Sequence, residues 1–144
     1  MLVKLRRLPA YERRLLVEAL SLVVRVRVAL WLLPFRRVRR MFATERHVRT
    51  ATGGPPPRSE QEAIGRAVRR AGSVVPDASC LTQAFAGRIM FARRGGTSLL
   101  RIGVAKEAAK LEAHAWVEID GRVVIGELPD LARFHPMPSL PGDG

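Results

Sequence analysis

The chain contains one cysteine, Cys80, and three histidines, and the pair of side chains best suited to chemistry is Cys80 and His114. A thiol is a strong nucleophile only as a thiolate, and a neighbouring imidazole can hold it in that form as an ion pair. We therefore interpret Cys80 as a nucleophile and His114 as its base. His47 and His135 lie in polar or proline-rich surroundings and are expected at the surface.

The residues around Cys80 indicate the start of a helix. Asp77 or Ser79 can cap free backbone N–H groups. Apolar side chains then recur at helical spacing from Leu81 to Ala92, and Gly95-Gly96 ends the pattern. Cys80 would lie in the first turn, where the helix dipole and free N–H groups favour a thiolate and could later hold an oxyanion.

His114 lies in a segment with the pattern of a β-strand. His114 to Ile119 alternates and is rich in β-forming residues, and Asp120-Gly121 is a strong two-residue hairpin signal. Residues 122–125 can return as the partner strand. With a two-residue loop, Val117 would face Val124, and the two strands would form part of a small antiparallel sheet.

This register gives a third candidate, because His114 would face Glu127. Directly opposed residues share a face of the sheet, with Cβ atoms about 4.5–5.5 Å apart. Glu127 could then orient the His114 ring and stabilise its imidazolium, which is the third role in a triad. Asp130 is the alternative if the strand bulges. Asp120, at the hairpin tip, is interpreted as part of the turn.

Two more residues lie close to these candidates in the sequence. Trp116 points to the same face of the strand as His114, so it could wall the site as a substrate-binding residue or fill the core. Gln83 lies about one turn after Cys80, a spacing that makes it a poor oxyanion donor. The sequence does not identify a second donor.

Three motifs together resemble the lasso-peptide maturation protease: Cys80-Leu81 at a helix start, Ile102-Gly103-Val104, and Ala113-His114-Ala115-Trp116-Val117-Glu118-Ile119-Asp120-Gly121. The resemblance is to the protease half of the lasso-peptide B protein, as a stand-alone chain, and covers about residues 76–130. That family is similar in fold to papain and the transglutaminases and uses Cys, His and an acidic residue, typically Asp. Cys80 and His114 match its motif, and a glutamate, Glu127, stands where the acid is expected.

The resemblance implies a cysteine peptidase that removes the leader from a ribosomally synthesised lasso-peptide precursor. It implies no metal or cofactor. The implied partners are the precursor peptide, a separate PqqD-like leader-recognition protein and an asparagine synthetase-like lasso cyclase that uses ATP. Two other classes stay open. One is a transglutaminase or acyltransferase with the same triad, and the other is a non-catalytic scaffold in which Cys80 is structural.

The length and charge of the chain limit its domain organisation. At 144 residues there is room for one domain with a modest core, plus arms. A single cysteine excludes an internal disulfide framework, and no Cys/His cluster has zinc spacing, which both fit a reducing cytoplasm. The net charge is +12, but residues 1–50 hold 13 of the 25 Lys and Arg residues and only three acidic ones. This segment therefore carries most of the positive charge.

Residues 1–50 are predicted to form a basic N-terminal arm with one long helix from Pro9 to Leu33. Arg25 and Arg27 interrupt its apolar runs, which are shorter than the roughly 20 residues that span a bilayer. The arm could pack on the core, dock a partner protein or an acidic leader, or make peripheral contact with a membrane surface. Nucleic-acid binding is not indicated, because aromatic residues are few and no reader motif is present.

Residues 51–58 form a Pro/Gly-rich linker, and residues 59–144 are assigned to the protease core. Ser59 to Glu62 reads as a capping box that opens a helix to about Ala71, with an apolar stripe that is expected to be core: Ala63, Ile64, Ala67 and Val68. After the Cys80 helix, residues 98–105 read as a strand and Lys106 to Lys110 as a polar connection to the next one. The fold class is α+β, a helix packed on a small antiparallel sheet of three strands.

Overall fold

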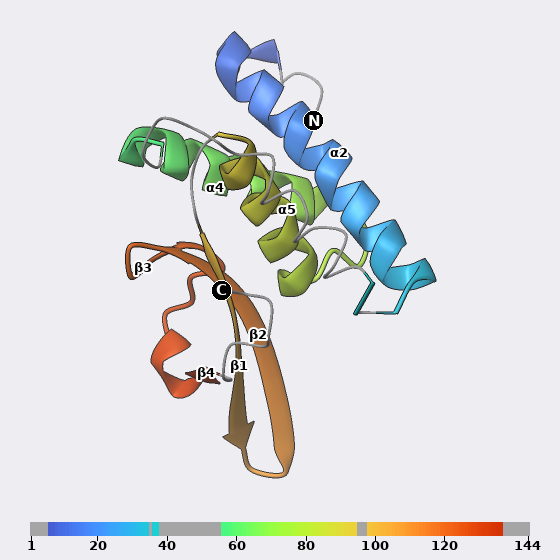
Figure 1. Cartoon of the computed structure of the whole chain (residues 1–144), viewed down its shortest axis with the longest axis vertical. Coiled ribbons are helices and arrows are strands. Elements are labelled where there is room, and N and C mark those ends of the chain that lie inside the picture. Colours follow the sequence, from blue (N-terminus) through green and yellow to red (C-terminus); the bar gives the residue numbers. More distant parts are fainter. Residues whose placement is uncertain (1–5, 35, 38–55, 95–97, 137–144) are drawn as a thin grey trace.

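The computed structural model describes residues 6–34, 36–37, 56–94 and 98–136. Helices and strands follow one another along the chain as α2 (Ala10–Leu32), α4 (Arg58–Val74), α5 (Cys80–Arg93), β1 (Leu99–Glu107), β2 (Lys110–Ile119), β3 (Arg122–Ile125), the 3-10 helix η2 (Leu131–Arg133) and β4 (His135–Pro136). Figure 1 shows the three helices gathered at one end and the sheet extending from them. The predicted α+β class is confirmed.

Helix α2 packs against the other helices. It begins after Pro9, as predicted, since the fixed φ of proline suits a helix start. One face of α2 is buried in the same cluster as the inner faces of α4 and α5, and it consists of Leu15, Ala19, Leu22, Val23 and Val26. No helix in the described part of the chain is long and apolar enough to cross a membrane.

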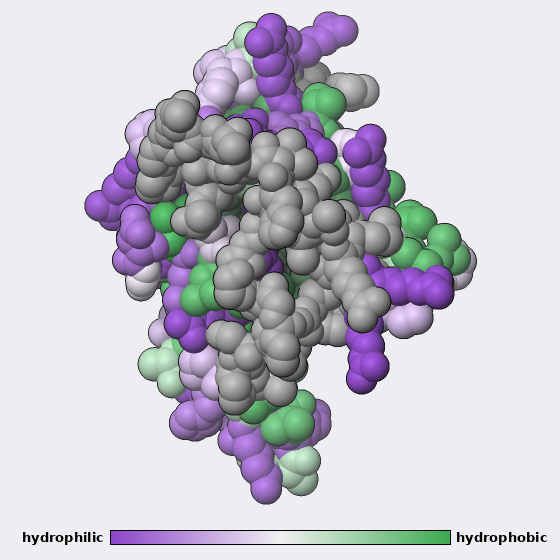
Figure 2. Space-filling model, viewed as in Figure 1, coloured by the Kyte–Doolittle hydropathy of each residue, from purple (hydrophilic) through white to green (hydrophobic). Residues whose placement is uncertain are grey.

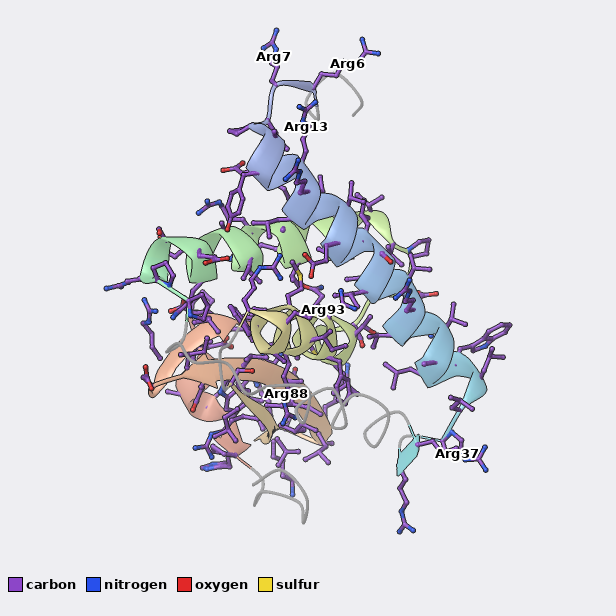
Figure 3. The ribbon with its side chains drawn as sticks, turned by 45° about the horizontal axis from the view of Figure 1, so that its top comes forward. Arg6, Arg7, Arg13, Arg37, Arg88 and Arg93 are labelled. Carbon is purple, nitrogen blue, oxygen red and sulfur yellow. The ribbon has the colours of Figure 1, made fainter. Side chains whose placement is uncertain are left out.

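The outer face of α2 leaves apolar and basic side chains in solvent. Hydrophobic residues gather at its C-terminal end (Figure 2), where Leu32 is 65% exposed and the neighbouring Trp31 is 76% exposed. Figure 3 shows Arg6, Arg7 and Arg13 at the opposite end of the helix and Arg37 beyond its C-terminus. The described arginines of the arm are therefore spread along its length instead of converging on one point.

Helix α4 buries the predicted stripe of Ala63, Ile64, Ala67 and Val68. The prediction of a capping box at Ser59 is wrong, because the helix already begins at Arg58 and Pro57 occupies the cap position without a side-chain hydrogen bond. Proline presets the backbone for a helix start, so no hydroxyl cap is needed.

Carboxylates of α2 tie it to the other two helices. Glu18 accepts hydrogen bonds from Arg94, the shorter at 2.6 Å, and from Arg93 at 3.4 Å. Burial alone would raise the pKa of Glu18, but the hydrogen bonds and positive charge of Arg94 and Arg93 outweigh it and hold that pKa below its usual value. Arg94 also pairs with Glu60 of α4, so one arginine joins all three helices.

The sheet has the strand order β3-β2-β1-β4, with every neighbouring pair antiparallel. Two predictions about the sheet were incomplete, the length of its strands and their number. β1 and β2 extend through the expected polar connection and leave only a turn at Ala108 and Ala109. A fourth strand, β4, comes from the Pro-rich tail. The two-residue β4 carries almost no sequence pattern of its own, so pairing with β1 defines it.

The register predicted for the β2–β3 hairpin is correct only at its tip. Ile119 pairs with Arg122, but a bulge between Val117 and Glu118 pairs Val117 with Ile125 and not with Val124. A bulge inserts one extra residue and shifts every later partner by one position. His114 therefore does not lie directly opposite Glu127.

Glycines let the helices approach the sheet closely. A Cβ atom on Gly87 of α5 would lie 1.8 Å from the side chain of Ile125, and one on Gly65 of α4 would lie 2.9 Å from the carbonyl oxygen of Val124. α5 thus covers one face of the sheet, while α4 lies against β3. The opposite face of the sheet buries a second cluster, formed by Trp116, Ala105 and Phe134.

Candidate active site

Cys80 is the first residue of α5, and local interactions define that position. The Ser79 hydroxyl oxygen accepts a hydrogen bond from the backbone N–H of Thr82 at 3.3 Å, so Ser79 is the cap and Asp77 is not. Asp77 lies in the preceding turn with a φ of 59°. The Cys80 thiol is free and half-buried, at a helix end whose first N–H groups point towards any negative charge placed there.

His114 is held by contacts with residues that follow it in the chain. Its Nε2 atom lies 2.6 Å from the carbonyl oxygen of Gly126. A carbonyl oxygen can only accept, so Nε2 carries the proton and donates it, and Nδ1 is the nitrogen left to accept a proton. The ring lies beside Trp116, at 6.2 Å between centroids, and beside Phe134, at 5.6 Å.

Gly126 has a conformation and a location that require glycine. Its φ is +85°, and a Cβ atom there would lie 2.7 Å from the carbonyl oxygen of Ala115 and 3.0 Å from Cβ of Trp116. This backbone partner of His114 was not predicted from the sequence. The available signal was a glycine directly after a returning strand, which often marks a bulge or a close approach of two backbones.

One cavity of about 230 Å³ brings the three predicted site residues together. Cys80, His114 and Glu127 all line it, and so does Gln83. Within the described structure, Cys80 and His114 face this cavity without a direct hydrogen bond, and such bonds often shorten only when a substrate binds. The Gln83 side chain makes one long hydrogen bond, at 3.4 Å, from Nε2 to the carbonyl oxygen of Ala78.

Trp116 lies behind His114 and is only 3% exposed. Its indole N–H donates to the Glu118 carboxylate at 2.9 Å. Its ring is stacked beside that of His114, so the buried Trp116 packs against the imidazole.

Neither of the other two acidic candidates lines this cavity. Asp130 accepts a 2.6 Å hydrogen bond from Arg133, which is the main cause of its lowered pKa, and the charge of His114 is a weaker contributor. Asp120 lies at the hairpin tip with a φ of 51°, as the turn interpretation expects. His135 is exposed, and His47 lies outside the described residues.

In the described ranges, no group of three or more His, Cys, Asp or Glu side chains is arranged to hold a metal ion. The cavity therefore presents a thiol, an imidazole, a carboxylate and an amide as its reactive and polar side chains, together with the guanidinium of Arg69.

Comparison with known proteins identifies the family. The model of the transglutaminase-like superfamily matches residues 21–139, which include the second half of α2 and every later element, and hence Cys80, His114 and Glu127. No curated protein and no solved structure matches the chain. Three helices packed on a small antiparallel sheet fit a minimal core of that superfamily. The chain therefore belongs to the transglutaminase-like superfamily, which indicates an activity of the cysteine peptidase or transglutaminase type.

Proposed function

We propose that this protein is a cysteine peptidase that cleaves the leader from a lasso-peptide precursor. The observation that carries the proposal is that Cys80, at a helix N-terminus, and His114, on a strand, line one cavity. Membership of the transglutaminase-like superfamily supports the chemistry. The Cys-Leu and His-Ala-Trp-Val-Glu motifs, which resemble the lasso-peptide protease, support the choice of substrate.

The proposed reaction begins with proton transfer from Cys80 to Nδ1 of His114. The thiolate attacks the scissile carbonyl carbon, and backbone N–H groups of the first turn of α5, including that of Cys80, stabilise the oxyanion. His114 returns its proton to the leaving amine as the C–N bond breaks. Water, deprotonated by His114, then attacks the thioester, which releases the carboxylic acid and restores the thiol.

The carbonyl oxygen of Gly126 takes the orienting role in this proposal. It fixes the imidazole with Nε2 protonated, so Nδ1 is free to act as the base. Glu127 lines the same cavity, and its negative charge would favour the imidazolium that forms during catalysis. In this proposal Glu127 acts as the acid of the triad, and the carbonyl oxygen of Gly126 orients the ring.

Gln83 is the proposed second oxyanion donor. Its position about one helical turn after Cys80 argued against this role, but its side chain lines the same cavity as Cys80. Its present hydrogen bond to Ala78 is long at 3.4 Å, so little is lost when the amide turns towards a developing oxyanion.

The proposal includes partners for recognition of the leader. A cavity of about 230 Å³ holds a few side chains around a scissile bond and no more. Recognition of the rest of the leader would then fall to a separate PqqD-like protein, and closure of the macrolactam to an ATP-using lasso cyclase. Peripheral contact of α2 with a membrane surface remains part of the proposal, since Trp31, Arg36 and Arg37 are exposed.

The test is mass spectrometry of a candidate lasso precursor incubated with this protein and the recognition protein, with Cys80→Ala in parallel. A single cut between leader and core, absent with Cys80→Ala, is the expected result. A leader whose new C-terminal carbonyl is joined to an added amine in place of the core would assign an acyltransferase instead. Equal cutting by both proteins would remove Cys80 from the mechanism, and binding without cutting by either would favour a scaffold.

A further inference from the structure

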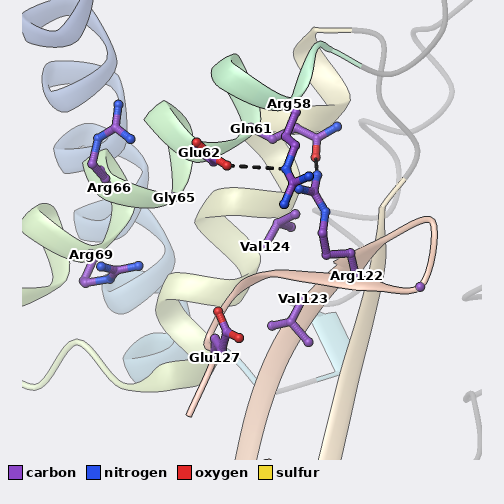
Figure 4. A pocket seen from close by; sticks show the side chains of 11 residues that line it. Arg58, Gln61, Glu62, Gly65, Arg66, Arg69, Arg122, Val123, Val124 and Glu127 are labelled. Atoms are coloured by element: carbon purple, nitrogen blue, oxygen red, sulfur yellow. Dashed lines mark hydrogen bonds and ion pairs between the residues drawn. The ribbon is translucent and has the colours of Figure 1, made fainter. Parts of the chain in front are cut away.

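A second, larger cavity adjoins the candidate active site. It has a volume of about 550 Å³ and lies between α4 and β3 (Figure 4). The two cavities share Gly65, Arg69 and Glu127 as lining residues, so they adjoin each other. A volume of this size is typical of ligand sites and accommodates several residues of an extended peptide.

Four arginines line this larger cavity, which we call the arginine cavity. Arg58, Arg66 and Arg69 come from α4 and Arg122 from β3, against two acidic side chains, Glu62 and Glu127. The helical period places the three α4 arginines along one exposed side of the helix, so the charge is concentrated on one wall. The cavity thus has a formal excess of positive charge where it meets the cavity of Cys80.

Two of these arginines lack a carboxylate partner in the described structure. Arg58 pairs with Glu62 at 3.5 Å, and Arg66 pairs with Glu12 at 3.7 Å. The Arg69 guanidinium forms no ion pair or hydrogen bond with any described residue. Arg122 donates to the neutral amide oxygen of Gln61. Arg69 and Arg122 are therefore the two arginines of this cavity without a carboxylate partner among the described residues, and both can bind an anionic ligand.

The Arg122 side chain is held in place by a buried amide. Gln61 is only 6% exposed, and its Nε2 donates to the carbonyl oxygen of Pro56 at 2.8 Å. This bond fixes which end of the Gln61 amide faces Arg122, and the amide oxygen in turn fixes the guanidinium (Figure 4). A positioned guanidinium loses less side-chain entropy when it binds a carboxylate with its remaining N–H groups.

From these contacts we propose that the arginine cavity binds an acidic segment of the peptide substrate, next to the scissile bond. Arg69, which lines both cavities, binds the carboxylate closer to Cys80, and Arg122 binds a carboxylate further along the chain. This inference rests on the proposed peptidase function for the identity of its ligand as a substrate. Val123 and Val124 supply the apolar part of the wall, as expected for a peptide site.

A peptide fits this cavity better than a nucleic acid does. Only two of the four guanidiniums are free of carboxylates, which gives few contacts for a continuous line of phosphates. The lining contains no aromatic side chain on which bases could stack. Individual carboxylates on an extended chain match two separated cations.

Fluorescence anisotropy tests the inference without requiring cleavage. The probe is a fluorescein-labelled peptide of six alternating alanine and glutamate residues, amidated at its C-terminus, and its counterpart has glutamine for glutamate. The protein is the full chain carrying Cys80→Ala. At low ionic strength the glutamate peptide should bind about tenfold more tightly than the glutamine peptide, and 0.5 M salt should remove most of the difference.

Two variants with the same change in charge locate the binding. Arg69→Gln should weaken binding of the glutamate peptide about five- to tenfold and leave the glutamine peptide unchanged. Arg13→Gln removes an exposed charge near the start of α2 that lines neither cavity (Figure 3), and it should change neither affinity by more than about twofold. Arg69→Lys keeps the charge and should retain an intermediate affinity.

The outcomes separate this inference from the proposed function. Equal affinity for both peptides would overturn the proposal that the arginine cavity binds an acidic segment, even if the precursor is cleaved. Equal losses of affinity for the glutamate peptide in Arg69→Gln and Arg13→Gln would overturn it as well. Tighter binding of a single-stranded DNA of twelve nucleotides, lost in Arg69→Gln, would also overturn it in favour of a nucleic-acid site. Arg69-dependent binding of the glutamate peptide, together with no Cys80-dependent cleavage, would leave the cavity in place and remove the peptidase.

Discussion

The two halves of the candidate site are held by different kinds of structure. Cys80 owes its position to its neighbours in sequence, because the Ser79 cap and the first turn of α5 are formed within four residues. His114 depends on Gly126, which is 12 residues away, and on the packing of Phe134. Because the packing of α5 in the core adds to these local contacts, the helix half should tolerate a single local change. The strand half should fail when the sheet is disturbed.

Removal of the imidazole gives the largest expected effect. His114→Ala should lower kcat/KM for precursor cleavage by about 10³-fold, since it removes both the base and the acid of the proposed reaction. Single-turnover mass spectrometry measures this, with His135→Ala as the matched control because His135 is exposed on the edge strand β4. Similar losses in both variants would point to damage of the sheet and not to the chemistry of His114.

A second comparison uses two glycines of the same hairpin region. Gly126→Ala introduces a Cβ atom 2.7 Å from the carbonyl oxygen of Ala115 at a φ of +85°, so it should cost about 2–4 kcal/mol of stability. Gly121 has a similar φ, +77°, but a Cβ atom there would have no other atom within 4 Å. Gly121→Ala should therefore cost only about 1 kcal/mol of stability.

Activity should separate these two glycines further. Gly126→Ala displaces the carbonyl that orients His114, so kcat should fall about 10- to 100-fold in the fraction that remains folded. Gly121→Ala should leave kcat unchanged. Chemical denaturation and single-turnover cleavage measure the two quantities, and equal kcat values for the two variants would show that the contact of His114 with Gly126 has no orienting role.

Much of the helix half was predictable, because its signals are local. The start of α5 at Cys80, the cap at Ser79 as one of two alternatives, and the apolar stripe of α4 were all present in the sequence. Each depends on residues within one or two turns. The turn at Asp120-Gly121 was predictable for the same reason, and Ile119 does pair with Arg122.

The register of the strand half beyond the hairpin tip and the arginine cavity were not predictable, because they depend on packing between elements far apart in sequence. The bulge at Val117 and Glu118 follows from how β3 meets the sheet, and it carries Gly126, not Glu127, to His114. The approach of Gly65 to Val124 brings the α4 arginines beside β3. Nothing in the spacing of these residues along the chain indicates that they adjoin.

The opposite end of α5 gives a test of stability without chemistry. Glu18→Gln removes the carboxylate shared by Arg93 and Arg94 and should cost about 1–2 kcal/mol at pH 7, while kcat stays unchanged. The pKa of Glu18 is lowered in the folded protein, so its contribution is complete above the unfolded pKa and is lost as the pH falls through the folded pKa.

The difference in Tm between wild type and Glu18→Gln should therefore be largest near neutral pH and shrink in the acidic range below 4.5. Glu107→Gln is the control, since Glu107 is 74% exposed in its 3.7 Å pair with Arg133 and should change Tm little. A Tm difference that stays constant from pH 7 to pH 3 would contradict the role assigned to the Glu18 carboxylate.

The smallest expected effect is at the cap of α5. Ser79→Ala removes the oxygen that accepts from the Thr82 N–H and should cost about 1 kcal/mol by chemical denaturation, with kcat/KM reduced only a few-fold. Ser73→Ala, which loses an exposed bond near the end of α4, should cost less than about 0.5 kcal/mol. The helix can still start at Cys80, because the packing of α5 on the sheet holds it there.

A loss of kcat/KM in Ser79→Ala as large as that in Gly126→Ala would contradict this expectation. The helix half would then depend on its cap as strongly as the strand half depends on its glycine, and the contrast between the two halves would disappear.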